Sequence, residues 1–423
     1  MKTLREFLDA SHSVYHAIAN LEEDLLAEGY ALLPEGEEWL LNPGGKYYVN
    51  RGGSALIAFR VPETQPRGFL LTASHADRPS FKVKENGVLE GKYTRLATEK
   101  YGGMLISTWL DRPLSIAGRV IVQTEKGVEN RLLDIDRDLL LIPNVAIHMN
   151  RKVNEGYAWN PAVDTLPLAG SEEAKGKLWA EVEAAAGGKI LGHDLYLYLR
   201  QEASVWGIEQ QFISAQGLDD LQCVWGCTQG FLTAGNSSDI PVLCVFDSEE
   251  VGSCSVQGAA SRLLENTLDR ICASLQLDKH ILLSQSFMLS ADNAHALHPN
   301  HPEFSDTTNA PVVNGGVVLK FNANLRYATD GASAAVVRQA CQKAGVPVQT
   351  YYNRADLPGG STLGSISLSN VSVPTADIGL AQLAMHSAYE TAGVLDGDYL
   401  ARASAAYYSS TMAVNTDGSL ELL

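Results

Sequence analysis

The chain has 423 residues, of which 45% are hydrophobic, so it can bury a large core in one or two domains and is not globally disordered. Its net charge of −17 disfavours nucleic acids and anionic membrane surfaces as partners, because both require a basic face. The apolar stretches are too short or too interrupted by charges for a membrane span or a signal peptide. Six cysteines, mostly in apolar runs and without a C-x-x-C pair, are typical of a reduced protein. We therefore expect a cytoplasmic globular protein.

The predicted elements begin with an amphipathic helix over residues 3–29, followed by strands at GKYYVN, SALIAFRV and GFLLTASHAD. From about residue 83 to 200 the pattern changes to short alternating segments, among them KYTRLATEK, MLISTWL and GRVIVQT, separated by glycine, proline and charged turns. Helical patterns lie near the end of this region, at residues 172–185 and 195–201. The region is expected to form a β-rich insert.

Strands and helices alternate again in the C-terminal half of the chain. Strands are predicted at PVLCVF, GVVLKFNAN, PVQTYY and SVPTADIG, and helices at residues 260–275, SAAVVRQACQKAG and AYYSSTMAV. Such alternation predicts an α/β fold with a mixed central sheet flanked by helices. The catalytic domain would then be discontinuous, with parts at 1–84 and 206–423 on either side of an insert at 85–205.

Five spots with acidic or histidine side chains follow apolar strand-like runs or lie in Gly/Ser-rich turns, where α/β sheets build their sites. Several are weak alone, because adjacent aspartates are commonly a solvated turn or a helix N-terminus and a lone histidine is commonly a core residue. The spots are SHAD with His75 and Asp77, GLDD with Asp219 and Asp220, FDSEEVGS with Glu249 and Glu250, SADNAH with Asp292, and AMHS with His386.

The adjacent Glu249 and Glu250 raise the sharpest question, since two neighbouring carboxylates at the end of a buried strand repel each other. Their repulsion is relieved by a nearby cation, by protonation of one carboxylate, or by exposure of both to open water. If one glutamate binds a metal and the other faces a water molecule, the cation offsets the repulsion and the second glutamate can act as a general base. Two histidines with three carboxylates suit a pair of divalent ions, most simply zinc, with manganese or cobalt as alternatives.

The ordered motifs SHADRP, GLDD, FDSEEVGS, SADNAHALHPNH, LPGGSTLGSI and MHS resemble the aspartyl aminopeptidase family of two-zinc metallopeptidases. Residues 101–122 and the stretch IPNVAIHMNR resemble that family's dimerisation domain. The resemblance implies removal of N-terminal amino acids from peptides with a free N-terminus, by a homo-oligomer in which dimers assemble into a dodecamer.

The resemblance also implies a role for each motif residue. Glu249 would be the general base that takes a proton from a metal-activated water, and Asp77 would orient His75. The implied metal ligands are His75 and Asp292 for one ion, Glu250 and His386 for the other, and Asp219 as the bridge. Related two-zinc aminopeptidases with Asp-Asp at the bridge often have a cis peptide there, and we predict one between Asp219 and Asp220.

The sequence says less about substrate contacts than about metal ligands. It does not decide whether the substrate's N-terminal residue has an acidic or a neutral side chain. Lys320 is either a group that faces a substrate carboxylate or a strand-edge lysine. His148 either reaches from the insert into a neighbouring subunit's site or is a core histidine. Gly360 lies in the Gly-rich segment 356–365, which lacks the GK[ST] ending of a phosphate loop and is interpreted as backbone lining the substrate site.

Two other interpretations compete with an aminopeptidase. One is another two-zinc hydrolase, an N-acyl amino-acid deacylase or a carboxypeptidase; those usually have a smaller insertion after the metal-bridging residue, whereas this insert lies between His75 and Asp219. The other is a non-enzymatic assembly protein, which the intact set of predicted ligands disfavours.

Overall fold

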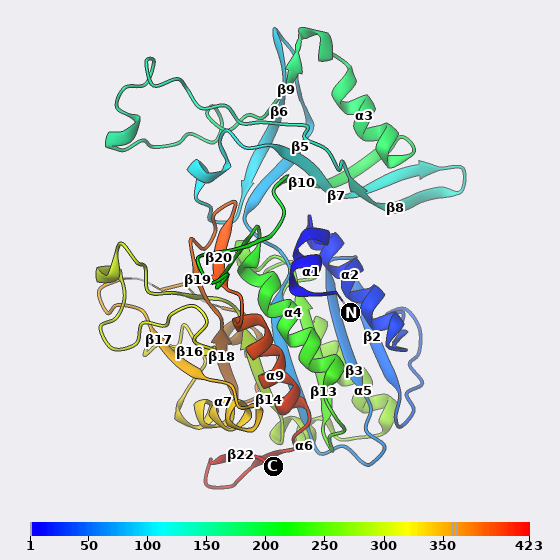
Figure 1. Ribbon diagram of the computed structural model, residues 1–423. Helices are drawn as coiled ribbons and strands as arrows, with labels where there is room; N and C mark the ends of the chain where they lie inside the picture. Colours follow the sequence, from blue (N-terminus) through cyan, green and yellow to red (C-terminus); the bar gives the residue numbers. More distant parts are fainter. Residues whose placement is uncertain (1, 358, 361) are drawn as a thin grey trace.

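The computed structural model describes residues 2–357, 359–360 and 362–423, and within them a nine-stranded mixed sheet is the centre of the larger body of the molecule (Figure 1). Its central strand β4 is parallel to both of its neighbours, β13 and β14, whereas β3 runs antiparallel to β13 and β16 antiparallel to β18. In spatial order the strands are β1 (Ala31–Leu32), β2 (Lys46–Arg51), β3 (Ala55–Arg60), β13 (Ile240–Phe246), β4 (Phe69–His75), β14 (Phe287–Ala291), β18 (Thr375–Gly379), β16 (Val317–Phe321) and β17 (Val348–Tyr352).

Helices cover both faces of this sheet, because its central strands are apolar on both sides. Every residue of β4 and of β13 is buried, as is typical of strands between two helical layers. One core lies under α1 (Leu4–Ala10), α2 (Val14–Ala27), α4 (Leu218–Thr233), α7 (Gly331–Ala344) and α9 (Asp396–Tyr408). The other lies under α5 (Leu263–Leu275), α6 (Lys279–Ser284) and α8 (Leu363–Ser367).

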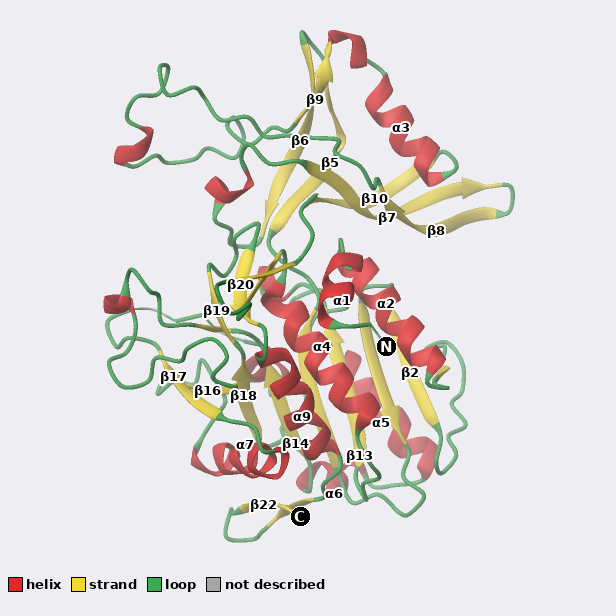
Figure 2. Ribbon diagram, viewed as in Figure 1, coloured by secondary structure: helices red, strands yellow, loops and turns green. Residues whose placement is uncertain are grey.

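A second, wholly antiparallel sheet of six strands, counted over the described residues, forms the insert and stands apart from the first sheet (Figure 2). Helix α3 (Lys177–Ala186) packs on it through Leu178, Val182 and Ala186. In spatial order its strands are β8 (Gly127–Asp134), β7 (Leu114–Thr124), β10 (Ile190–Leu199), β5 (Ser80–Leu89), β6 (Tyr93–Tyr101) and β9 (Leu168–Ser171). The predicted combination of a mixed central sheet, flanking helices and a β-rich insert is confirmed.

Smaller elements join these two bodies. A third sheet consists of β11 (Ser204–Trp206), β12 (Phe212–Ala215), β20 (Glu390–Gly393), β19 (Ala381–Leu383) and β15 (Ala294–His295), and β21 (Met412–Val414) pairs with β22 (Leu420–Leu422) near the C-terminus. Short 3-10 turns lie at Ile106–Trp109, Val153–Glu155, Glu172–Ala174, Glu249–Val251 and Pro302–Phe304. Over the part of the chain that the structure describes, no helix combines the length and the apolar character needed to cross a membrane.

Several predicted elements are wrong in detail. The helix expected over residues 3–29 is two helices, because the Ser13 side chain accepts the backbone N–H of His16 and caps a new start. Residues 195–201, predicted as helix, belong largely to β10, whose residues Leu195, Leu197 and Leu199 alternate into the core of the insert.

The remaining differences concern three short segments. MLISTWL contains a 3-10 turn instead of a strand, and AYYSSTMAV contains the end of α9 followed by β21. Helix α4 was not among the predicted helices, although one of the two interpretations of the aspartate pair, a solvated turn or a helix N-terminus, places a helix start there.

Candidate metal centre

The predicted ligand residues meet at one edge of the central sheet. His75 is the last residue of β4, Asp292 directly follows β14, and the glutamate pair follows β13 after two residues. These three strands are parallel neighbours, so their carboxyl ends open at the same edge. Asp219 joins them from the first turn of α4 and His386 from the turn between β19 and β20.

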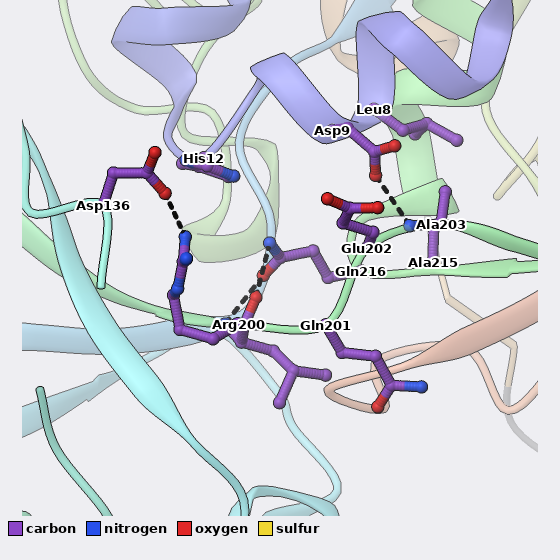
Figure 3. Close-up of a pocket in the computed structure, with 11 residues that line it drawn as sticks. Leu8, Asp9, His12, Asp136, Arg200, Gln201, Glu202, Ala203, Ala215 and Gln216 are labelled. Atoms are coloured by element: carbon purple, nitrogen blue, oxygen red, sulfur yellow. Dashed lines mark hydrogen bonds and ion pairs between the residues drawn. The ribbon is translucent and has the colours of Figure 1, made fainter. Parts of the chain in front are cut away.

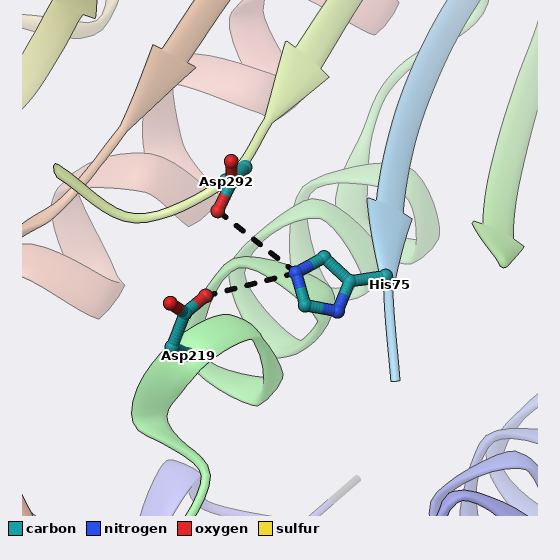
Figure 4. Close-up of side chains that lie close together, drawn as sticks. All are labelled: His75, Asp219 and Asp292. Atoms are coloured by element: carbon teal, nitrogen blue, oxygen red, sulfur yellow. Dashed lines mark ion pairs between the residues drawn. The ribbon is translucent and has the colours of Figure 1, made fainter. Parts of the chain in front are cut away.

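His75, Asp219 and Asp292 form the first half of the cluster (Figure 4). His75 Nε2 lies 3.6 Å from Asp219 Oδ1 and 3.9 Å from Asp292 Oδ1. The His75 side chain is only 1% exposed, so its imidazole is held inside the protein with Nε2 facing the two carboxylates.

His386, Glu250 and Asp219 form the second half. His386 Nε2 lies 3.4 Å from Glu250 Oε1 and 3.5 Å from Asp219 Oδ2. Asp219 therefore presents one carboxylate oxygen to each histidine. The His386 side chain is 32% exposed, and this half of the cluster is the more open to solvent.

Asp77 contacts several members of the cluster and fixes their positions. His75 Nδ1 lies 3.1 Å from the backbone carbonyl of Asp77 and 3.3 Å from its Oδ1, which leaves Nε2 free to face the carboxylates. The backbone N–H groups of Glu249 and Glu250 donate to the Asp77 carboxylate at 3.0 and 3.1 Å. One buried carboxylate thus fixes the imidazole and the glutamate pair together.

The cluster has the chemistry of a cation site. Asp219 Oδ1 and Glu250 Oε1 are buried, yet neither accepts a hydrogen bond from any residue that the structure describes. Two imidazoles and several carboxylates in groups whose ligand atoms lie within 4.8 Å of one another make a donor set that suits divalent zinc. Buried acceptors without donors are costly unless a cation satisfies them, so the residues fit a metal.

Glu249 is placed to handle a proton beside the cluster. Its Oε2 lies 4.0 Å from His75 Nε2. Burial raises the pKa of the Glu249 carboxyl to about 7, with the His75 imidazole opposing this shift and the Asp292 carboxylate adding to it. A carboxyl group with a pKa near neutrality can both accept and release a proton.

Comparison with known proteins identifies the chain. The sequence profile of the family described as Aminopeptidase I zinc metalloprotease (M18) matches residues 7–408. The chain belongs to this family. A probable M18 family aminopeptidase 2 from Clostridium acetobutylicum is 41% identical over 424 residues, which cover 96% of this chain and 98% of that protein.

Solved structures agree. The structure of the Ape4 and Nbr1 complex matches this M18 aminopeptidase with a TM-score of 0.92 at 33% identity, over 96% of this chain and 84% of that chain. The mApe1 dodecamer from S. cerevisiae matches with a TM-score of 0.84 at 26% identity, over 96% and 95%. The expected family, fold and zinc metallo-aminopeptidase activity are confirmed, and the interpretations as a deacylase, a carboxypeptidase or a non-enzymatic protein are set aside.

Two buried carboxyl groups of this M18 aminopeptidase support the site in ways that the sequence did not reveal. Glu390 accepts the backbone N–H of Asp219 at 3.0 Å and that of His386 at 2.6 Å, and so ties the two halves together. In the sequence, the indication that Glu390 belongs to the site is its position four residues after His386. Asp220 is fully buried and accepts the backbone N–H of His75 at 3.2 Å, and the peptide bond between Asp219 and Asp220 is cis, as predicted.

Lys320 is neither at a strand edge nor free. It lies in β16, between β18 and β17, and is 2% exposed. Its ammonium donates to the Asp292 carbonyl at 2.8 Å, to Asp292 Oδ2 at 3.1 Å and to the Asn293 carbonyl at 3.1 Å. These three bonds use its three donors, and the Lys320 and His75 charges lower the pKa of Asp292 although burial alone would raise it. The contacts favour a role in orienting Asp292 over contact with substrate.

His148 and Gly360 lie outside the cluster. His148 is exposed in the insert, so the alternative of a core histidine is wrong. Gly360 is exposed within segment 356–365, of which Pro358 and Ser361 lie outside the described residues. The end of this segment is anchored by the Thr362 hydroxyl, which donates to Asp377 Oδ1 at 2.5 Å.

A separate cavity of about 320 Å³ lies between the N-terminal helices, the end of β10 and β12 (Figure 3). Several of its polar groups are bonded within the protein. Arg200 contacts Asp136, the Asp9 carboxylate accepts the backbone N–H of Ala203 at 2.6 Å, and Gln216 bonds to the backbone of Leu199. The cavity lies where the insert meets the catalytic region. It is lined by Leu8, Asp9, His12, Asp136, Leu199, Arg200, Gln201, Glu202, Ala203, Ala215 and Gln216.

Proposed function

We propose that this M18 aminopeptidase holds two zinc ions per subunit and uses them to release N-terminal residues from peptides. The observation that supports two ions most strongly is the arrangement of Asp219, whose two oxygens face two different histidines. In this proposal His75 and Asp292 would hold one ion, Glu250 and His386 the other, and Asp219 would be the ligand shared by both. Manganese or cobalt could take the same positions, because the donor set is mixed imidazole and carboxylate.

The metal ions and the side chains have different roles in the proposed reaction. Zinc, when bound by these residues, would supply a Lewis acid able to polarise the scissile carbonyl and to increase the acidity of water. Glu249 would accept a proton from the attacking water and return it to the nitrogen of the leaving peptide, and its position beside the cluster, with Oε2 4.0 Å from His75 Nε2, is suited to this role. Asp77 keeps His75 in the tautomer and orientation that its Nε2 needs.

Assembly is proposed from a relative. The mApe1 dodecamer from S. cerevisiae shares the fold of this chain over 96% of its length. The insert loop around His148 exposes three apolar side chains, Val145, Ile147 and Met149, of which Met149 is 82% exposed. An apolar, exposed loop is suited to contact another copy of the chain. We therefore propose a homo-oligomer, built from dimers to a dodecamer, in which His148 approaches a neighbouring subunit's site.

The test combines metal binding with hydrolysis. Metal-free protein is titrated with zinc by calorimetry, and the loaded enzyme is assayed on substrates with free and blocked amines bearing Asp, Glu, Leu, Ala or Lys. We expect two zinc ions per subunit and cleavage only of free-amine substrates, and the ranking of Asp against Leu gives the side-chain preference.

The variant Glu249→Gln isolates the proton transfer. It should still bind two zinc ions but lose roughly 10²–10⁴-fold in kcat, the usual contribution of a general base. The exposed Glu209→Gln is the matched control and should behave as the parent. Unchanged turnover by Glu249→Gln would exclude its role as the base, and one zinc per subunit in the parent would exclude the two-ion centre.

A further inference from the structure

Residues 101–105 of the insert, here called the connector segment, contact the metal centre of the same subunit. It begins at Tyr101, the last residue of β6, where this strand leaves the insert and reaches the catalytic region (Figure 1). The predicted role of the insert is contact between subunits, which does not account for bonds inside one subunit.

Tyr101 bonds directly to the carboxylate that organises the cluster. Its hydroxyl donates to Asp77 Oδ2 at 2.7 Å, the same oxygen that accepts the backbone N–H of Glu250 at 3.1 Å. Asp77 Oδ1 accepts the N–H of Glu249 at 3.0 Å and lies 3.3 Å from His75 Nδ1. The insert thus supplies one of four donors around a carboxylate that is 3% exposed. Removing one donor from a buried carboxylate leaves part of its charge uncompensated.

The rest of the connector segment lies against the other half of the cluster. Gly102 has a φ of +74°, and a Cβ at this position would lie 3.1 Å from Glu250 Cβ and 3.4 Å from the Glu250 carbonyl oxygen. The chain therefore approaches Glu250 as closely as a glycine allows. The backbone N–H of Leu105 donates to the carbonyl of His386 at 3.0 Å, which fixes the turn that bears this histidine.

Thr108 reinforces this attachment just beyond the connector segment. Its hydroxyl donates to the Leu105 carbonyl at 2.7 Å and accepts the backbone N–H of Ala388 at 2.9 Å. The turn around His386 is thereby held to the insert on two sides.

We infer that the connector segment positions both halves of the metal centre within its own subunit, with Tyr101 as the principal positioning residue. This inference rests on the proposed two-zinc function. The bond from Tyr101 sets the orientation of Asp77 and hence of His75 and the glutamate pair, while Leu105 and Thr108 set His386. The insert is then a structural part of each catalytic site as well as an assembly element.

The test is zinc titration of metal-free protein, comparing Tyr101→Phe with Tyr196→Phe. Tyr196 is a matched control, because its ring packs edge-on against Tyr101 at 5.5 Å in the same insert, while its hydroxyl bonds to none of the residues that the structure describes. Tyr101→Phe should weaken zinc binding at one or both sites by roughly 10–100-fold, the usual effect of losing a partner that orients a ligand. Tyr196→Phe should titrate as the parent does.

Further measurements separate positioning from general damage. The sedimentation of Tyr101→Phe should equal that of the parent, and kcat should fall with little change in KM. The melting temperature of the metal-free variant should fall only slightly, because Asp77 keeps its other donors. If Tyr101→Phe lowers this melting temperature strongly, Thr108→Val is the decisive variant: it should still weaken zinc binding, through His386 alone. Parent-like titration by Tyr101→Phe, or by Thr108→Val in that case, overturns the inference. A parent that binds no zinc overturns the proposed function itself.

Discussion

The catalytic region of this M18 aminopeptidase and the outer surface of its insert differ in where they place charged and apolar side chains. In the catalytic region, charged side chains such as Lys320, Asp77 and Asp396 are buried and bonded to partners in the same subunit. In the insert, strand β8 is mostly exposed and the loop with His148 carries apolar side chains on its surface. The catalytic region therefore depends on internal compensation of charge, and the insert on contacts with other parts of the protein or other copies. Substitutions of buried charged groups should accordingly change the stability of the first, and substitutions on the surface of the second should leave it folded but less active.

The strongest test of internal compensation is Lys320→Met. Removing the Lys320 ammonium leaves buried Asp292 without its ion-pair partner and with only the His75 imidazole nearby among the residues that the structure describes, and breaking a buried pair in this way costs about 3–5 kcal/mol. We expect the metal-free variant to unfold at a clearly lower temperature, with zinc recovering more stability than it gives the parent, because the ion then compensates Asp292. The ratio of Asp to Leu cleavage should not change.

The matched control is Lys279→Met, which breaks the more exposed pair with Asp269. Such a pair contributes about 0–1 kcal/mol, so thermal unfolding should change little. A change in the Asp to Leu ratio in Lys320→Met, with unchanged stability, would restore Lys320 as a substrate-binding residue.

Asp396 gives the second test, through pH. It is buried at the start of α9, where its oxygens accept the backbone N–H groups of Asn314 and Gly316, and burial raises its pKa from 3.8 to about 7. The folded state therefore binds a proton more tightly than the unfolded state. The stabilisation from this group is complete below about pH 4 and is lost as pH rises through 7, by as much as roughly 4 kcal/mol.

Asp396→Asn removes this titration while keeping one oxygen acceptor. The stability of the variant relative to the parent should rise steadily between pH 4 and pH 8, as measured by thermal unfolding across that range. Asp398→Asn, exposed in the same helical turn, should follow the parent at each pH. Parallel curves for Asp396→Asn and the parent would show that this carboxylate does not titrate in the range.

The difference between the two regions also explains which strands and site residues could be predicted from the sequence. Strands β4 and β13 are buried on both faces, so each is a continuous apolar run whose polar end marks the site, and His75, Glu249 and Glu250 were found in this way. Strand β10 was assigned in part to a helix, because its alternating leucine and tyrosine residues are apolar enough to fit either period.

Partners in the site were harder to predict than its ligands. The bond from Tyr101 to Asp77 spans 24 residues, and Lys320 reaches Asp292 across 28. Neither residue has a local pattern that distinguishes it from an ordinary strand residue. Such partners are determined by which strands become neighbours, and a single sequence gives no direct measure of that.

The smallest expected effect concerns the insert surface, where His148→Ala tests contact between subunits. We expect roughly a tenfold loss of kcat, about 1.4 kcal/mol, with unchanged unfolding temperature and sedimentation, because the side chain is exposed in its own subunit. His280→Ala, which replaces an exposed histidine of α6, is the control and should keep full activity.

Co-expression of His148→Ala subunits with Glu249→Gln subunits makes the test of contact between subunits decisive. In mixed oligomers an intact His148 from one subunit can serve an intact Glu249 site in its neighbour, so activity should exceed that of either variant alone. Mixed oligomers with no such recovery would place the action of His148 within its own subunit, and full activity of His148→Ala alone would remove it from the reaction.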